Sequence, residues 1–184
     1  MLHALDLPVD LDTRIGGVVL RRARPGDLGA LMRLLSDDPI SASRGDVAAS
    51  DDEPAYRRAL EEILGDPAND LLVAVVGVGV GVGASTSDRD GDGRLVGTLQ
   101  LTRIPGMARR GSTRLLVEAV RVRSDLRSSG IGGAMMRWVT DVAAPALGSS
   151  LVQLTSDAAR VDAHRFYERL GFAASHTGFK YRVR

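Results

Sequence analysis

The sequence contains no cysteine among its 184 residues. That absence excludes disulfide bonds, thiolate metal ligands and a cysteine nucleophile that could carry an acyl group. A chain without cysteine also suits a reducing compartment, where disulfides do not persist. We therefore expect a cytoplasmic protein.

Long apolar stretches are missing as well. No stretch reaches the ~18 consecutive apolar residues that a transmembrane helix needs. The N-terminal segment carries Asp6, Asp10 and Asp12, where a signal peptide would need an apolar core. These two absences predict a protein that is neither exported nor inserted in a membrane.

Neither sign of charge is in excess. Lys and Arg number 24 against 23 Asp and Glu, so the formal net charge is +1. A protein that binds nucleic acid needs a basic surface that neutralises several phosphates, and this balance predicts no such partner. Lys180 is the single lysine, and the many arginines supply planar groups suited to carboxylates or phosphates.

Patterns of metal ligands are also scarce. Asp88, Asp90 and Asp92 begin like a calcium-binding loop, but Leu99 occupies the position of the bidentate glutamate. The preceding GVGVGVG repeats glycine at every second position and is not followed by a helix, unlike a dinucleotide-binding fingerprint. We predict no metal and interpret residues 77–94 as a flexible insertion.

Strand and helix patterns fill the rest of the chain. The order predicts one domain over residues 16–184 with an N-terminal extension over 1–15, built as a sheet sandwiched by helices. Asp27 suits a helix N-cap and Gly171 a helix C-terminus. Strands are expected near 18–20, 71–76, 95–104, 115–122 and 151–157, helices near 28–35, 54–64, 131–144 and 160–170, and a closing hairpin over 172–183.

The segment RSSGIGG, residues 127–133, joins a Val-rich run to a helical run. A glycine-rich turn between a strand and a helix opens the unpaired N–H groups of the helix N-terminus to an anion. No Walker lysine follows, and Met135 stands where a Rossmann fingerprint would have its third glycine. The residues alone leave two interpretations open: an anion site, or a tight strand-to-helix turn.

Three stretches resemble one family. VRVRSDLRSSGIGGAMM is similar to the acyl-CoA-binding motif of the GNAT superfamily of N-acetyltransferases, Arg/Gln-x-x-Gly-x-Gly/Ala after a strand that ends in valine. DAHRFYERLGF resembles the late motif of that family, and LRRARPGDLGALMRLL its usual opening. The resemblance spans about residues 18–183 and implies an α/β (α+β) fold: a mixed, mostly antiparallel sheet of six or seven strands flanked by about four helices.

The resemblance also implies acetyl-CoA as co-substrate. In this family the diphosphate of coenzyme A lies in the turn, held by backbone N–H groups, with Arg127 at the entrance. The pantetheine arm runs along the preceding strand, where a splayed or bulged strand offers it free N–H and C=O groups. The binding residues implied are Val120, Arg121, Val122, Arg127, Ser128, Ser129, Gly130, Ile131, Gly132 and Gly133.

Tyr167 is implied as the general acid of acetyl transfer. A phenol with a pKa of about 10 stays protonated at pH 7 and can deliver a proton to the departing thiolate. Ala163, Phe166 and Leu170 share its helical face, so Tyr167 could also be a core residue. The two roles are compatible, since a packed ring can present its hydroxyl at a cleft.

Glu118 is the candidate general base. It interrupts LLVEAVRV, a run apolar on both faces, where a buried unpaired carboxylate would be costly and would bind a proton more readily. The alternatives are an ion pair with Arg103, Arg121 or Arg123, and a water chain in place of a single base.

Arg160 and His164 are candidate substrate-binding residues. An imidazole with an unperturbed pKa of about 6.5 suits proton transfer, although a surface histidine is the alternative. Arg160 stands where many GNAT members have asparagine, which points to an anionic acceptor, and the C-terminal stretch also resembles aminoalkylphosphonate acetyltransferases. The acidic loop 36–54, expected to cover the acceptor cleft, favours a cationic amine or is simply solvated.

These observations predict an N-acetyltransferase that moves an acetyl group from acetyl-CoA to the primary amine of a small molecule by direct attack in a ternary complex. The alternatives are an acyl-CoA-binding sensor without turnover and, from RSSGIGG alone, an ATP-binding domain that lacks the expected lysine. By analogy with the family we expect a homodimer.

Overall fold

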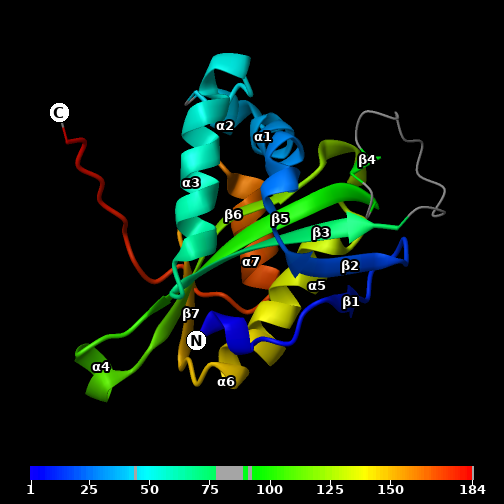
Figure 1. Ribbon diagram of the computed structural model, residues 1–184. Helices are drawn as coiled ribbons and strands as arrows, with labels where there is room; N and C mark the ends of the chain where they lie inside the picture. Colours follow the sequence, from blue (N-terminus) through cyan, green and yellow to red (C-terminus); the bar gives the residue numbers. More distant parts are fainter. Residues whose placement is uncertain (44, 78–88, 91–92, 184) are drawn as a thin grey trace.

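The computed structural model describes residues 1–43, 45–77, 89–90 and 93–183. The predicted insertion at 77–94 and its calcium-like aspartates fall largely outside these residues. The described chain forms one mixed sheet with helices on both faces (Figure 1). The predicted fold class is therefore confirmed.

The sheet has seven strands. Six follow the order β1-β2-β3-β5-β6-β7, and the short β4 pairs with β5. Neighbouring strands are antiparallel except β6 and β7, which are parallel. The strands are β1 (Val9–Leu11), β2 (Val18–Arg22), β3 (Asn69–Val76), β4 (Arg89–Asp90), β5 (Gly93–Ile104), β6 (Arg114–Val122) and β7 (Leu151–Leu154).

Four α-helices in the described ranges have eight residues or more, as predicted, and shorter helical turns add to them. The helix predicted over 131–144 is confirmed as α5, a π-helical turn and α6 in succession. The α-helices are α1 (Leu28–Ser36), α2 (Pro39–Ala42), α3 (Glu53–Gly65), α4 (Ala108–Gly111), α5 (Ile131–Trp138), α6 (Ala144–Ala146) and α7 (Val161–Arg169). 3-10 turns lie at Leu2–Ala4, Pro25–Asp27, Ser50–Asp52 and Ser124–Leu126, and the π-helical turn at Val139–Ala143.

Both faces of β3 are buried, which explains why its sequence is almost continuously apolar. Successive side chains of a strand point to opposite faces. Leu71 and Val73 pack into a cluster with α1 and α3, whereas Leu72 and Ala74 belong to the larger core that includes α5. Figure 1 shows α1 and α3 on one side of the sheet and α5 on the other.

The N-terminal residues are joined to the domain. We expected residues 1–15 to form an extension, and the sequence pattern did not place them in the sheet. β1 pairs antiparallel with β2, and Leu2, Leu5 and Leu11 are buried in the larger core. This segment therefore completes one edge of the sheet.

The closing hairpin predicted over 172–183 is wrong. Within the described residues no strand follows α7, and the chain runs away from the body of the molecule (Figure 1). Phe179, Tyr181 and Val183 alternate with polar residues as in a strand, but they are 93%, 89% and 88% exposed. Alternation alone does not form a strand when the chain has no pairing partner in reach. The predicted end of the last helix is confirmed, since Gly171 has a φ of 87°.

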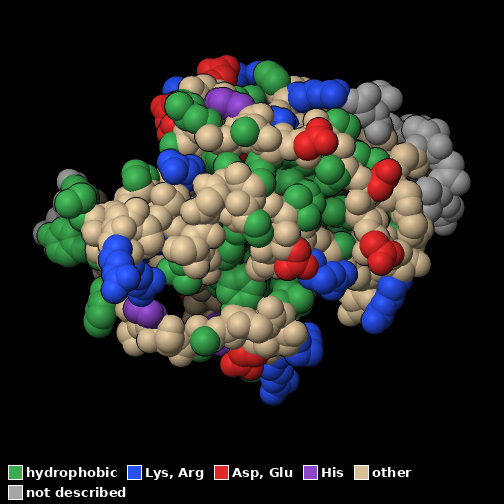
Figure 2. All heavy atoms as spheres, turned by 90° about the horizontal axis from the view of Figure 1, so that it is seen from below, with side chains coloured by type: hydrophobic (Ala, Val, Ile, Leu, Met, Phe, Trp, Pro, Cys, Tyr) green, Lys and Arg blue, Asp and Glu red, His purple; other side chains and the backbone are tan. Residues whose placement is uncertain are grey.

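Charged side chains are spread over the surface. Seen from below, acidic and basic groups are interspersed with hydrophobic ones (Figure 2). In the described part of the chain, no helix has the length and apolar character needed to cross a bilayer.

The core makes a direct stability prediction. Leu72 is 0% exposed between the two layers, so Leu72→Ala should lower the free energy of unfolding by about 2–5 kcal/mol through lost burial and a cavity. Met107 is 96% exposed, and Met107→Ala should change the free energy of unfolding by less than about 0.5 kcal/mol. Urea unfolding of both variants measures the difference. Equal losses would contradict this assignment of the core.

Candidate active site

Strands β6 and β7 separate part-way along their length. Their parallel pairing runs from Arg114 opposite Leu151 to Val117 opposite Leu154. β7 ends there, whereas β6 continues to Val122. Among the residues that the structure describes, no strand therefore lies beside residues 118–122 on this edge. Their backbone groups can accept an extended ligand as if it were an additional strand.

On its other edge β6 carries a β-bulge. Glu118 pairs with Gln100 and Arg121 with Thr98, so that Ala119 and Val120 together oppose the single residue Leu99. Ala119 has a φ of 50°, in the left-handed region that residues other than glycine seldom adopt. Bulges re-aim side chains next to active sites. The structure therefore combines a splayed and a bulged strand at the place implied by the resemblance.

The turn after β6 exposes backbone N–H groups. Gly130 caps α5 in the left-handed conformation with a φ of 94°. The first helical bond of α5 is donated by the N–H of Ala134 to the carbonyl of Gly130, at 2.9 Å. The N–H groups of Ile131, Gly132 and Gly133 thus precede the first intrahelical bond, as expected at a helix N-terminus. Such groups can hold an anion.

Arg14 fixes the carbonyl side of the same turn. Its backbone N–H donates to the carbonyl of Ser129 at 3.0 Å, and its guanidinium donates to the carbonyl of Ser128 at 3.2 Å. Because Arg14 engages the carbonyl oxygens, the turn is held with its N–H groups available on the other side. Arg14 was not predicted from the sequence, since nothing local links it to residues 128–129.

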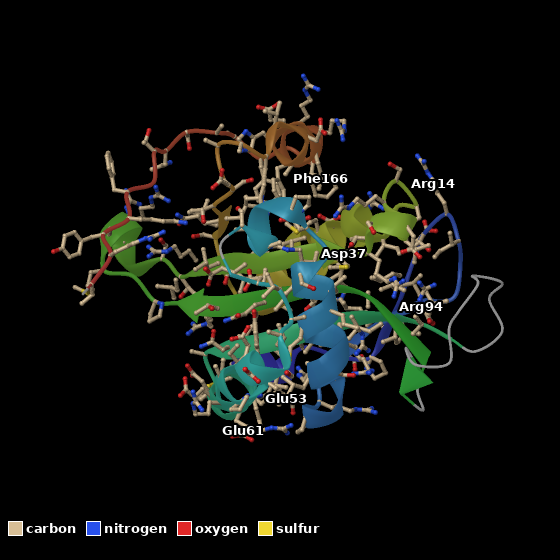
Figure 3. All side chains as sticks on the ribbon, turned by 90° about the horizontal axis from the view of Figure 1, so that it is seen from above. Arg14, Asp37, Glu53, Glu61, Arg94 and Phe166 are labelled. Carbon is tan, nitrogen blue, oxygen red and sulfur yellow. The ribbon has the colours of Figure 1, made fainter. Side chains whose placement is uncertain are left out.

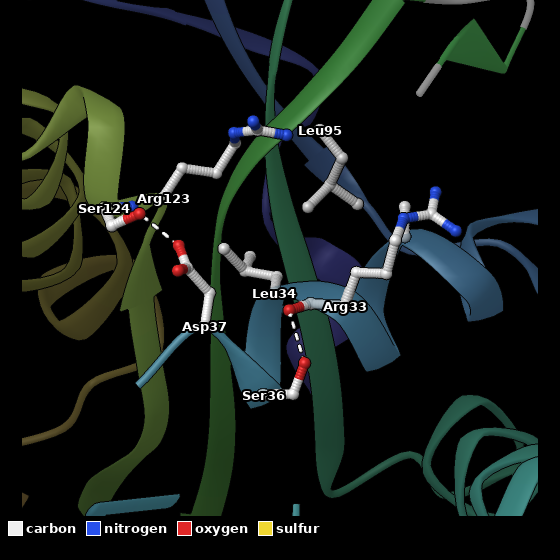
Figure 4. A pocket seen from close by; sticks show the side chains of 8 residues that line it. Arg33, Leu34, Ser36, Asp37, Leu95, Arg123 and Ser124 are labelled. Carbon is white, nitrogen blue, oxygen red and sulfur yellow. Dashed lines mark hydrogen bonds between the residues drawn. The ribbon is translucent and has the colours of Figure 1, made fainter. Parts of the chain in front are cut away.

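The end of α1 is tied to this region. The carboxylate of Asp37 accepts from the N–H of Ser124 at 2.7 Å, and its carbonyl accepts from Arg127 at 2.9 Å. Arg127 therefore lies at the rim of the turn. Next to it, a cavity of about 350 Å³ lies between α1 and the ends of β5 and β6 (Figure 4); it is lined by Ala30, Arg33, Leu34, Ser36, Asp37, Leu95, Arg123 and Ser124.

Tyr167 is a packed residue of α7 that lies near Arg121 and Arg160. Its ring makes edge-to-face contacts with Phe166 and Phe172, with centroids 5.1 Å and 5.8 Å apart, and packs against the larger core. Burial raises the pKa of the Tyr167 hydroxyl, although the nearby guanidinium groups of Arg121 and Arg160 oppose the rise. The hydroxyl therefore stays protonated at neutral pH and can donate.

Arg160 forms an ion pair within the protein. Its guanidinium binds the carboxylate of Asp38 through both oxygens, and the two side chains are only 19% and 11% exposed. The N–H of Ser41 donates to the same carboxylate at 2.8 Å. Burial alone would raise the pKa of Asp38, but the hydrogen bonds from Arg160 and Ser41 outweigh it and hold the pKa below its ordinary value of 3.8. This ion pair joins α2 to the start of α7.

Arg121 lies beneath α2. It donates to the hydroxyl of Ser41 at 2.8 Å and to the carbonyl of Val120 at 2.8 Å. Burial lowers the pKa of Arg121, with Arg160 adding to that effect. Loop 36–54 therefore contacts β6 through Ser41 and the start of α7 through Asp38. That it covers the acceptor cleft stays a prediction, and residue 44 lies outside the described residues.

Glu118 is not buried, contrary to the premise on which we chose it. Its side chain is exposed, because β6 has already lost β7 as a neighbour at this point. None of the three arginines proposed as partners pairs with it. Arg103 donates to Thr113, Arg121 to Ser41 and Arg123 to Asp125. Glu118 is therefore an open carboxylate on the strand that carries the bulge.

His164 contacts the backbone of its own segment. Its Nε2 lies 2.8 Å from the carbonyl oxygen of Asp157, a contact that holds the loop before α7. Within the described part of the chain, no three His, Asp or Glu side chains gather as metal ligands would.

Asp38 and Ser41 were not predicted as site residues. A local signal for Asp38 exists, since an aspartate directly before Pro39 is typical of a helix N-cap. Its pairing with Arg160, far along the chain, has no such signal.

The chain can now be compared with known proteins. A family model described as "Acetyltransferase (GNAT) family" matches residues 31–172, which includes the bulged strand, the turn and α7. The chain belongs to the GNAT acetyltransferase family. Among curated proteins none matches it significantly.

Solved structures share the GNAT fold of this chain. A transcriptional regulator from Bacillus halodurans C-125 is 37% identical over 90% of this chain and 99% of its own, with a TM-score of 0.76. Glucosamine-6-phosphate N-acetyltransferase from Arabidopsis thaliana is 18% identical, covering 91% and 99%, with a TM-score of 0.64. Ribosomal-protein-alanine N-acetyltransferase from Brucella melitensis biovar Abortus 2308 is 21% identical, covering 91% and 99%, with a TM-score of 0.62. The last two show the fold alone.

The Asp38 ion pair predicts a pH-dependent stability. Because the pKa of Asp38 is lowered on folding, its ionised form stabilises the fold above about pH 4, and this contribution disappears as the pH falls through the lowered value. Asp38→Asn should cost about 1–3 kcal/mol at pH 7, and the gap to wild type should close toward pH 3. Urea unfolding of both proteins between pH 7 and pH 3 measures this difference in the free energy of unfolding. Asp162→Asn, at a side chain that is 99% exposed, should have nearly the wild-type free energy of unfolding. A difference between Asp38→Asn and wild type that did not change with pH would refute the ionic account.

Proposed function

We propose that this GNAT protein is an N-acetyltransferase that moves the acetyl group of acetyl-CoA to the primary amine of a small molecule by direct attack in a ternary complex. The observation that carries the proposal is the continuity of two open backbone surfaces. The free edge of β6 at residues 118–122 is followed, after the turn at 123–130, by the N–H groups at 131–133. Together they fit a long ligand with amides at one end and phosphates at the other.

The residues of the chain fit such a co-substrate. The N–H groups after Gly130 would hold the diphosphate, with Arg127 at the rim. The β6 edge would bond the amides of the pantetheine arm, which would otherwise lose water without a replacement hydrogen bond. A Cβ on Gly130 would contact the backbone N of Arg14 at 3.5 Å, an ordinary van der Waals distance, but the φ of 94° would strain any residue other than glycine.

Tyr167 and Glu118 are proposed to move the two protons of the reaction. The protonated hydroxyl of Tyr167 would donate to the departing thiolate. An amine with a pKa of about 10.4 costs about 4–5 kcal/mol to deprotonate at pH 7, and the open carboxylate of Glu118 would accept that proton directly or through water. Positioning of the amine against the thioester supplies the rest of the rate enhancement.

Release of free thiol from acetyl-CoA across a panel of primary amines tests this function. Thiol release that depends on one or more amines supports the enzyme. Calorimetry with coenzyme A should be run beside it. Tight binding of coenzyme A with no thiol release from any amine would replace the proposal with a binding protein that lacks turnover.

Removal of the Tyr167 hydroxyl should slow the chemical step. Tyr167→Phe keeps the ring contacts with Phe166 and Phe172 but removes the proton donor, so kcat should fall by about 10²-fold or more, while the Kd for coenzyme A stays the same. Tyr181→Phe, at a tyrosine that is 89% exposed, should leave kcat unchanged. A Tyr167→Phe enzyme with wild-type kcat would remove Tyr167 from the mechanism.

The turn makes a matched prediction. Gly130→Val places a β-branched residue at a φ of 94° beside the N–H groups, and coenzyme A should bind at least about tenfold more weakly as their geometry is lost. Gly148→Val puts the same kind of strain at a φ of 62° in a turn at the opposite end of β6 from Gly130, and should leave the Kd unchanged. Calorimetry on folded variants checks both. An unchanged Kd for Gly130→Val would oppose the assignment of the turn.

A further inference from the structure

The bulge brings two charged side chains to one face of β6. Thr98 and Gln100 are two residues apart on β5, so their side chains share a face of the sheet. Directly opposed residues of an antiparallel pair also share a face, and the partners of these two are Arg121 and Glu118. In a regular strand, residues three apart would face opposite sides. The extra residue at Ala119 and Val120 removes that difference.

The face they share is the one covered by α2. Arg121 reaches the hydroxyl of Ser41, whereas Val120 and Val122 pack against the larger core on the other side. Glu118 is exposed on the same face as Arg121. A carboxylate and a guanidinium thus lie along one wall of the cleft that is proposed for the acceptor.

The charge of Arg121 lacks a direct counter-ion. In the described part of the chain its guanidinium bonds only uncharged oxygens, those of Ser41 and Val120, and its Nε is buried without a partner. The carboxylate of Asp38, which also accepts from Ser41, is bound through both oxygens by Arg160. A partly buried cation without a direct ion pair favours an anionic ligand, because desolvation has removed much of its hydration.

The carboxylates of Asp38 and Asp46 interact with Arg121 electrostatically, but in the described part of the chain neither forms an ion pair with it. Asp37 accepts from the N–H of Ser124, and Asp46 accepts from the hydroxyl of Tyr56 at 2.7 Å. Glu53 and Glu61 lie on α3, at the opposite edge of the molecule from Phe166 and α7 (Figure 3). The acidity of the loop therefore serves its own attachments more than it serves a cationic ligand.

We infer that the acceptor is a zwitterion, a primary amine whose short carbon chain carries a carboxylate or phosphoryl-type anion; Arg121 binds the anion and Glu118 faces the ammonium group. The inference rests on the proposed function and specifies its substrate class. Three residues of extended chain span at most about 10 Å, and the two side chains can approach one another from those positions. A molecule with a few bonds between amine and anion fits between them. Arg121 and its planar fork suit either kind of anion.

Matched amines test the inference. β-Alanine and β-alaninamide differ only in the anion, and so do phosphoethanolamine and ethanolamine for the phosphoryl case. With acetyl-CoA saturating, the anionic member of at least one pair should show a kcat/KM at least about tenfold higher in the wild-type enzyme. The pair with the larger ratio identifies the kind of anion.

Variants of Arg121 separate recognition from folding. Arg121→Gln should reduce the ratio of kcat/KM within the preferred pair to about one, mainly by raising KM for the anionic amine relative to KM for the neutral amine. Arg121→Lys keeps the positive charge but loses the planar guanidinium group, so it should retain part of the kcat/KM ratio between the anionic and the neutral amine. Arg58→Gln, at an exposed arginine of α3, is the matched control and should leave both amines unaffected.

The outcomes distinguish this inference from the proposed function. The zwitterion inference would be overturned, and the acetyltransferase left in place, if the wild-type enzyme released thiol as fast with neutral amines as with anionic ones. An equal loss of kcat/KM for both amines in folded Arg121→Gln would have the same meaning. No thiol release with any amine, anionic or neutral, would overturn both. Thermal unfolding of Arg121→Gln and Arg121→Lys verifies that each is folded before its ratio is interpreted.

Discussion

The arrangement of the cleft depends on one extra residue in β6. The bulge at Ala119 and Val120 changes which side chains face the core and which face the cleft. It leaves Val120 and Val122 in the apolar layer with α5, and turns Arg121 toward α2. Since β7 has already ended, the same stretch also has a free edge. Core packing, backbone recognition and charge placement all arise from the geometry of this short segment.

The parts of the fold that local patterns determine were predictable from the sequence. β3 is apolar at consecutive positions because both of its faces are buried, so the run of residues 71–76 identified a central strand. Gly130 and Gly171 both adopt a positive φ, which glycine tolerates without strain. The turn before α5 and the end of the last helix could therefore be placed, and the family motifs fixed their order.

Features that depend on partners distant in the sequence could not be predicted. Nothing near Arg14 indicates that it binds the carbonyls of the turn, and nothing near Asp38 indicates its pairing with Arg160. Glu118 was expected to be buried because its neighbours are apolar, but burial depends on whether β7 extends beside it. The C-terminal segment has the alternation of a strand, yet it forms none, because pairing requires an available neighbour as well as a pattern.

The extra residue in β6 has a consequence for how related sequences are compared. A relative that lacks one residue between the counterparts of Glu118 and Val122 would have no bulge there, and its remaining residues would keep their sides of the sheet, because Ala119 and Val120 together oppose the single residue Leu99. A relative of the same length that formed a regular strand here, with the register at Glu118 kept, would instead carry its arginine into the apolar layer. Spacing along β6 is as informative as residue identity when one decides whether a relative retains the same cleft.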